Sequence, residues 1–235
     1  MGRIIFTATV VALLLVGCSS LIGVRGSGEV VTEIREVSDF DGVDLSGSGH
    51  VTITIGDEFA LVISAEDNIM PLLTSEVRQD TLVLGTSQSI NPTEEITYDV
   101  TMPQVSLLRV SGSGRIDAPD LVNEDLEVDV SGSGAVQIDA LSVTDLQAEV
   151  SGSGMVGASG AADHLQVSIS GSGALEAESL TARTGVVKVS GSGSVVVEVT
   201  DELEVDVSGS GSVEYLGEPP VLDVDVSGSG NVSGR

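Results

Sequence analysis

The chain has 235 residues, 41% of them hydrophobic, which is enough to bury a core and argues against intrinsic disorder. Its 36 acidic and 9 basic residues give a formal net charge of −27 at pH 7, which excludes nucleic-acid binding because that function needs a basic surface. Aromatic residues make up only 2%, so the core must consist of small branched side chains, which favours regularly stacked strands.

The first residues have the features of an export signal. A single basic residue, Arg3, precedes an uncharged, mostly apolar run over 4–16, which is too short to span a membrane and predicts a signal peptide over residues 1–17. The sequence LVGC that ends at Cys18 resembles the lipobox of bacterial lipoproteins, in which the cysteine is acylated and becomes the new N-terminus. We therefore expect lipidation at Cys18, the sole cysteine, with acyl chains that contribute about 0.8 kcal/mol per buried methylene.

This signal predicts an extracytoplasmic protein that is anchored in the cell envelope. Ser19 rather than Asp follows the cysteine, which by the sorting rule of Gram-negative lipoproteins implies the outer membrane if the host is Gram-negative. Residues 18–28 comprise the lipidated cysteine and a short tether of mainly small and polar residues.

Residues 29–110 contain strand-like alternation without a regular repeat. The segment AEDNIMPLLTSEV predicts one short helical turn, with Asp67 or Asn68 as its N-cap. Because the terminal repeats of a solenoid are usually atypical, we interpret residues 29–110 as a capping section that is continuous with the following domain.

The tetrapeptide SGSG occurs once in this section and then recurs through the rest of the chain, residues 111–235. It begins at residues 46, 111, 131, 151, 170, 190, 208 and 227, so the intervals after 111 are 20, 20, 19, 20, 18 and 19 residues. A fixed period of this size predicts a solenoid. Apolar and polar residues keep their alternation across each SGSG, which predicts that both glycines face the interior and that the serines face solvent in ladders hydrogen-bonded from coil to coil.

The glycines expected to have this structural role are Gly112, Gly114, Gly132, Gly134, Gly152, Gly154, Gly171, Gly173, Gly191, Gly193, Gly209 and Gly211. Coils of about 20 residues allow two or three short strands each, so the repeat predicts an all-β protein with a parallel β-helix. An antiparallel sandwich of hairpins is the alternative, but the regular Asn-Gly-type turns that it needs are absent. The last copy leaves a strand edge that offers a site for pairing with another molecule.

The sequence also resembles a known family. Phe40-Asp41-Gly42-Val43, then SGSGHVTI, then the array of (V/I)SGSGx(V/L/I) are similar to the bacterial family of auto-transporter adhesin head GIN domains, over about residues 30–233. This resemblance implies a right-handed β-helix and an export or lipoprotein signal, and it assigns no catalytic residues.

Few residues suit catalysis or metal binding. His50 and His164 are far apart and are expected at the surface, and the nucleophile motif Gly-x-Ser-x-Gly is absent. In the row two residues before each SGSG, Arg109 is expected to pair with Asp129, whereas Asp206 and Asp225 are the candidates for a shared cation such as Ca²⁺. Exposed carboxylates usually stay solvated, so no metal site and no cofactor are predicted.

The function expected from these features is a lipid-anchored structural or adhesin-like β-helix module without catalytic activity. Its partners are expected to be the membrane, through Cys18, and a surface glycan or protein. One alternative is a self-associating envelope scaffold that pairs through the C-terminal edge. Another is a carbohydrate-binding or carbohydrate-active β-helix, which for catalysis needs a groove with clustered acidic and basic side chains.

Overall fold

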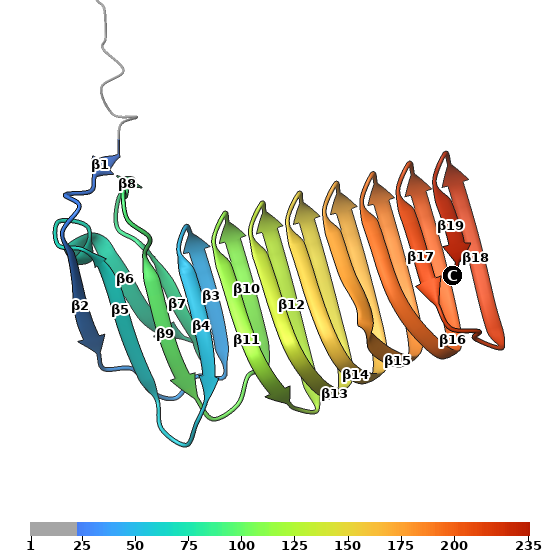
Figure 1. Cartoon of the computed structure of the whole chain (residues 1–235), viewed down its shortest axis with the longest axis horizontal. Coiled ribbons are helices and arrows are strands. Elements are labelled where there is room, and N and C mark those ends of the chain that lie inside the picture. The colour runs from blue at the N-terminus through green and yellow to red at the C-terminus, as the bar shows by residue number, and fades with distance from the viewer. Residues whose placement is uncertain (1–22) are drawn as a thin grey trace, which may run out of the picture.

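Parallel strands dominate the structure, a computed structural model that describes residues 23–235 (Figure 1). The N-terminal part contains β1 (Val24–Arg25), β2 (Val30–Arg35), β3 (Gly42–Gly47), β4 (His50–Ile55), β5 (Ala60–Glu66), the 3₁₀ helix η1 (Met70–Leu72), β6 (Leu73–Arg78), β7 (Thr81–Thr86), β8 (Ile90–Asn91) and β9 (Thr97–Met102). The repeat contains β10 (Leu107–Gly112), β11 (Arg115–Val122), β12 (Asp125–Gly132), β13 (Ala135–Gly152), β14 (Met155–Gly171), β15 (Ala174–Gly191), β16 (Ser194–Gly209), β17 (Ser212–Leu216), β18 (Val221–Gly228) and β19 (Asn231–Gly234). Within residues 23–235, no helix is long and apolar enough to cross a membrane.

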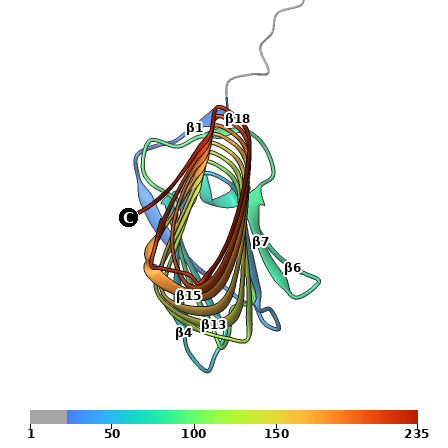
Figure 2. The same cartoon turned by 90° about the vertical axis from the view of Figure 1, so that its right-hand side faces the viewer.

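One strand ends at each SGSG corner and the next starts after it, and from β13 to β16 each strand runs without a break from one corner to the next. In the first full coil of the repeat, β10 ends at Gly112 and β11 starts at Arg115. Neighbouring coils pair in parallel and in register, so equivalent residues such as Gly112 and Gly132 lie opposite each other. Along the stack the coils nearly superimpose, with the SGSG corners at the narrow end of the outline (Figure 2). The predicted parallel β-solenoid is therefore confirmed, and the antiparallel sandwich is excluded for the repeat.

Columns of aliphatic side chains fill the interior, one side chain from each coil. The residue before each SGSG forms one such column, and in the repeat each member up to residue 207 is at most 1% exposed: Val110, Val130, Val150, Ile169, Val189 and Val207. A column of branched side chains keeps every coil in contact with its neighbours, which explains how so few aromatic residues suffice.

The two glycines of an SGSG corner have different roles. The second one faces the interior, as predicted: a Cβ on Gly134 would lie 2.7 Å from the carbonyl oxygen of Gly114 and would also contact Val110. The first one does not face the interior, so that part of the prediction is wrong. Gly132 has a φ of +107°, and its Cβ would lie 2.7 Å from the carbonyl oxygen of Gly112 in the adjacent coil. The alternation of inward and outward side chains continues with the same parity after the corner, because the corner contains an even number of residues.

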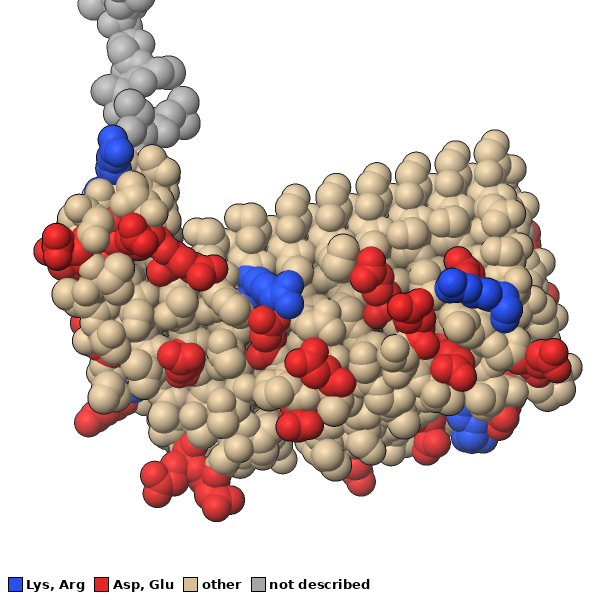
Figure 3. All heavy atoms as spheres, viewed as in Figure 1, with Lys and Arg blue, Asp and Glu red and all other residues tan. Residues whose placement is uncertain are grey.

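The backbone, rather than the serine side chains, joins the corners of successive coils. The amide of Ser133 donates a 2.8 Å hydrogen bond to the carbonyl oxygen of Gly112, and the same bond recurs at later corners. The serines lie at the surface, but among residues 23–235 no hydrogen bond joins serine hydroxyls of successive SGSG copies. The predicted hydroxyl ladder is therefore wrong: backbone hydrogen bonds join the corners of successive coils. On the face shown in Figure 3, this serine edge is free of charged side chains.

The N-terminal section contains the first coil of the solenoid as well as its cap. β3 and β4 stack in register against β10 and β11, so Gly47 lies opposite Gly112 although 65 residues separate them in the sequence. The segment between β4 and β10 extends the stack beyond this coil: β7 and β9 pair in parallel with β3 and β4, and β5 and β6 add antiparallel strands. β2, which precedes β3 in the chain, pairs antiparallel with β5.

The predicted helical turn is present as η1, but its cap residue is Ile69, with no side-chain cap hydrogen bond. Asp67 and Asn68 instead bind the N-terminal segment. The amide of Ser27 donates to Asn68 Oδ1 at 3.0 Å, and Asn68 Nδ2 donates to the carbonyl oxygen of Arg25 at 2.8 Å. These contacts explain why neither residue caps the helix.

The last residues of the predicted tether are thus attached to the cap, and β1 also pairs with β8. The Glu66 carboxylate, which is buried, accepts hydrogen bonds from the Thr93 hydroxyl at 2.6 Å, the Thr93 amide at 2.9 Å and the Gly28 amide at 2.7 Å. The Thr93 hydroxyl is the main cause that lowers the pKa of Glu66, because these donors stabilise the ionised carboxylate. The predicted signal peptide and Cys18 lie outside the described residues.

Candidate functional site

The side chains two residues before each SGSG form one row on the outer surface of the first strands. Arg109 lies between Asp44 and Asp129 in this row. Its Nη2 is 2.6 Å from Asp129 Oδ2, which confirms the predicted pair across adjacent coils. The hydrogen bond to Asp129 raises the pKa of Arg109, and burial raises the pKa of Asp44.

Farther along the same row, Asp206 and Asp225 are direct neighbours in register. Calcium takes six to eight oxygen ligands, more than two carboxylates supply. Among residues 23–235, no group of three or more His, Cys, Asp or Glu side chains is arranged to hold a metal ion. Asp206 and Asp225 therefore present two adjacent negative charges to solvent near the C-terminal end of the stack.

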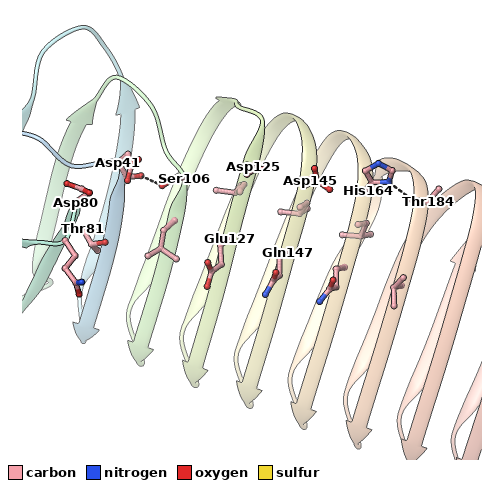
Figure 4. Close-up of a pocket in the computed structure, with 17 residues that line it drawn as sticks. Asp41, Asp80, Thr81, Ser106, Asp125, Glu127, Asp145, Gln147, His164 and Thr184 are labelled. Carbon is pink, nitrogen blue, oxygen red and sulfur yellow. Dashed lines mark hydrogen bonds between the residues drawn. The ribbon is translucent and has the colours of Figure 1, made fainter.

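A groove of about 690 Å³ crosses several coils, and two stacked rows of side chains line it (Figure 4). The first row contains Asp125, Asp145, His164 and Thr184. The second row contains Glu127, Gln147, Gln166 and Val186. Asp41, Asp80 and Ser106 lie at the end of the groove nearest the cap.

Strand alternation aims both rows of the groove outward. Between the rows, Leu126, Leu146 and Leu165 point into the core and are 2% exposed. In a strand, the residues before and after an inward side chain must face the other side of the sheet. The groove is therefore built on rigid, in-register strands, which hold its polar groups at the spacing of the coils, about 4.8 Å.

The groove is acidic. Five of its lining residues carry a carboxylate (Asp41, Asp80, Asp125, Glu127 and Asp145), and none is Lys or Arg. The remaining polar groups are amides, hydroxyls and the imidazole of His164, whose Nδ1 is 2.7 Å from Thr184 Oγ1. Such a lining attracts cations and hydrogen-bond donors and repels anions.

The first row contains in succession the residue types of an acid–base–nucleophile triad: Asp145, His164 and Thr184. A catalytic triad needs a hydrogen bond from the acid to orient the base. Only the contact between His164 and Thr184 is present, and His164 is exposed to solvent, as predicted. The other histidine, His50, is half-buried on the second strands, with Nε2 2.8 Å from Asp117 Oδ2. These contacts stabilise neighbouring coils, and the groove lacks the basic side chains that a polysaccharide lyase would need.

Sequence reasoning missed the groove, although part of its signal is visible. The two rows occupy the positions six and four residues before the SGSG of each coil, and aligning those positions shows the succession of Asp125, Asp145 and His164. The end formed by Asp41 and Asp80 has no such signal, because Asp41 immediately precedes β3, Asp80 lies in the cap, and neither aligns with the two rows.

The chain is similar to known bacterial proteins in sequence and in fold. A family model described as "Putative auto-transporter adhesin, head GIN domain" matches residues 39–219. The structure of a "putative adhesin" from Bacteroides fragilis is 24% identical, with a TM-score of 0.84 over 91% of this chain and 100% of that chain. One from Parabacteroides merdae is 18% identical, with a TM-score of 0.73 over 91% and 99%. A "putative lipid binding protein" from Parabacteroides distasonis is 21% identical, with a TM-score of 0.71 over 90% and 99%. No curated protein matches the chain.

Proposed function

We propose a function for this chain, which belongs to the auto-transporter adhesin head GIN domain family. It is a non-catalytic, lipid-anchored, adhesin-like module, and it binds a basic protein segment along the acidic groove. The observation that carries this proposal is the groove itself, with carboxylates, amides and hydroxyls in register across rigid coils. A solenoid presents an extended binding surface of this kind to an extended partner without a conformational change.

The charge of the groove favours a protein partner with Lys or Arg over a glycan. Of the five carboxylates, only Glu127 has a basic neighbour among the described residues, Arg109, whose Nη2 is 3.8 Å from Glu127 Oε1. The other four attract an extended basic segment and speed its association. Sugar binding usually relies on stacking against aromatic rings, but the whole chain has three Phe, two Tyr and no Trp. The adhesin description of the family is in line with a binding role of this kind.

The lipid binding named for the Parabacteroides distasonis structure is not extended to this chain. A site for an acyl chain needs an apolar cavity. In the part of the chain described here, stacked aliphatic side chains fill the interior, and the groove mixes apolar side chains with carboxylates, amides and hydroxyls.

The groove is tested by neutralising its carboxylates one at a time. Asp145→Asn and Glu127→Gln should each weaken the binding of a fluorescent oligo-lysine peptide roughly threefold to tenfold, measured by anisotropy at physiological salt. The matched control is Glu204→Gln, because Glu204 continues the second row beyond the groove lining. An equal loss in the control would mean that net charge alone binds the peptide. Binding of dextran, but not of the peptide, would make the ligand a glycan.

The lipid anchor is tested by fractionating cells that express the full chain. We expect the protein in the membrane fraction. We expect Cys18→Ser to abolish acylation and to release the protein, because the short apolar run over residues 4–16 anchors it poorly without acyl chains. Labelling with a radioactive or clickable fatty acid reports the modification directly. Unchanged labelling of the serine variant would contradict an anchor at Cys18.

A further inference from the structure

The strand at the C-terminal end of the stack, β18, exposes side chains whose counterparts in the preceding coil are buried. Leu222, Val224 and Val226 pair in register with Leu203, Val205 and Val207 of β16. Those partners are 0–1% exposed, whereas the three β18 side chains are 39–43% exposed. The apolar interior of the solenoid is therefore open to solvent at this end.

The free edge of β18 also presents backbone groups. Beyond the corner, the amide of Ser229 donates to Gly209 of the preceding coil, and equivalent bonds join each coil to the one before it. Since successive residues of a strand direct their backbone groups to opposite sides, the amide and carbonyl groups of Val224 and Val226 point away from β16. Such an edge is a template for another strand.

The opposite end of the molecule is protected against strand pairing. One of its edge strands, β2, places Glu33 and Arg35 beside Ile63 and Leu61 of β5, where the apolar side chains of the cap begin. Arg35 Nη1 donates to the carbonyl oxygen of Leu73 at 2.9 Å, which ties β2 to β6. Charged residues on the inward side of an edge strand prevent the addition of a further strand. Among residues 23–235, the edge strands of the large sheet are β2 and β6 at the cap and β18 and β19 at the C-terminal end. β18 carries Leu222, Val224 and Val226 at inward positions, whereas β2 carries Glu33 and Arg35 there.

We propose that β18 is a docking surface for a second copy of this chain, which joins tail to tail through antiparallel pairing of the two β18 strands. A strand edge is complementary to itself about a two-fold axis, and the joint closes as a dimer. A second copy presents the same three apolar side chains of β18, so the exposed Leu and Val side chains of the two strands meet each other. β1 lies at the far end of the stack, so the joint leaves the N-terminal segment unobstructed (Figure 1).

Charge sets the strength of this joint. Asp223 and Asp225 alternate with the apolar residues of β18 and face solvent. When apolar positions face apolar positions across the two-fold axis, the aspartates necessarily face the aspartates of the second copy. Like charges directly opposite each other oppose pairing, and salt screens them. The dimer is therefore expected to tighten as ionic strength rises.

Sedimentation velocity of residues 19–235, which include all of the described structure, tests the proposal over a range of protein and salt concentrations. We expect a monomer–dimer equilibrium without larger species. Asp225→Asn should tighten it roughly threefold to tenfold, and Val224→Lys should weaken it at least about tenfold. Because one variant strengthens and the other weakens the joint, loss of folding cannot mimic both results, and thermal melting of each variant checks the fold.

Two exposed apolar residues elsewhere supply the controls. Ile34→Lys alters the capped end and Val122→Lys alters the side of the stack, where these side chains are 77% and 81% exposed. Neither should change the equilibrium. A protein that stays monomeric at every concentration and salt, or one whose association responds to Ile34→Lys and not to Val224→Lys, overturns the proposal. This result is independent of the groove, whose peptide binding is measured separately.

Discussion

Replacing Gly152 with Ala should lower the free energy of unfolding by about 2–6 kcal/mol, whereas Ala at Gly47 should cost about 1–3 kcal/mol. Both are first glycines of an SGSG copy, with φ angles of +121° and +118°. Their surroundings differ: a Cβ at Gly152 would lie 2.5 Å from the carbonyl oxygen of Gly132, but a Cβ at Gly47 would have no neighbour within 4 Å. The first variant therefore combines backbone strain with a clash between coils, and the second has the strain alone.

Denaturant unfolding of the two variants and of the wild-type chain measures the difference. The double replacement of Gly152 and Gly154 by Val should be more damaging than either Ala variant, because Gly154 adds an inward clash with the carbonyl oxygen of Gly134 at 2.7 Å. Equal losses at Gly47 and Gly152 would show that conformation alone, and not the approach of the coils, requires glycine at the corner. An unchanged midpoint in the Val double variant would contradict the close stacking of the corners altogether.

Tyr98→Ala should destabilise the protein by about 3–5 kcal/mol, because it leaves a cavity where the cap meets the first coil. Tyr98 is 1% exposed and pairs in register with Val51 on one side and Ile63 on the other. Burial raises its pKa to about 12. An unfolded tyrosine ionises near pH 10, so the neutral phenol stabilises the fold below that pH, and this contribution is lost as the pH rises toward 12.

The matched controls are Tyr98→Phe, which keeps the ring, and Tyr215→Ala, which removes the only other tyrosine from the half-buried end of β17. Both should cost clearly less than Tyr98→Ala in urea unfolding at pH 7. If Tyr215→Ala were as damaging as Tyr98→Ala, the cap would not depend on the packing of this ring. A stability that stays constant from pH 9 to pH 12 would contradict the buried phenol.

Much of the fold was predictable because the period and the alternation of the repeat determine the length of each coil and the residues that face its interior. The spacing of SGSG predicts how many residues a coil holds, and the alternation around it predicts that Val130 and Val150 face the core. Equivalent residues of successive coils then pair with each other. Arg109 was therefore expected to lie beside Asp129, and Asp206 beside Asp225. Each of these inferences needs only local alternation and a constant period.

The sequence by itself therefore determined the stacked parallel architecture, the inward columns and the outward rows. Only the tertiary structure decided that Gly47 lies on Gly112 across a 65-residue interval, that the two glycines of a corner have different roles, and that Asp80 of the cap lies at one end of the groove formed by the coils. The physical reason is that periodicity specifies contacts between equivalent residues of neighbouring coils. Contacts between segments that are not equivalent, such as the cap and the groove, depend on how whole elements pack, and no repeat in the sequence encodes that packing.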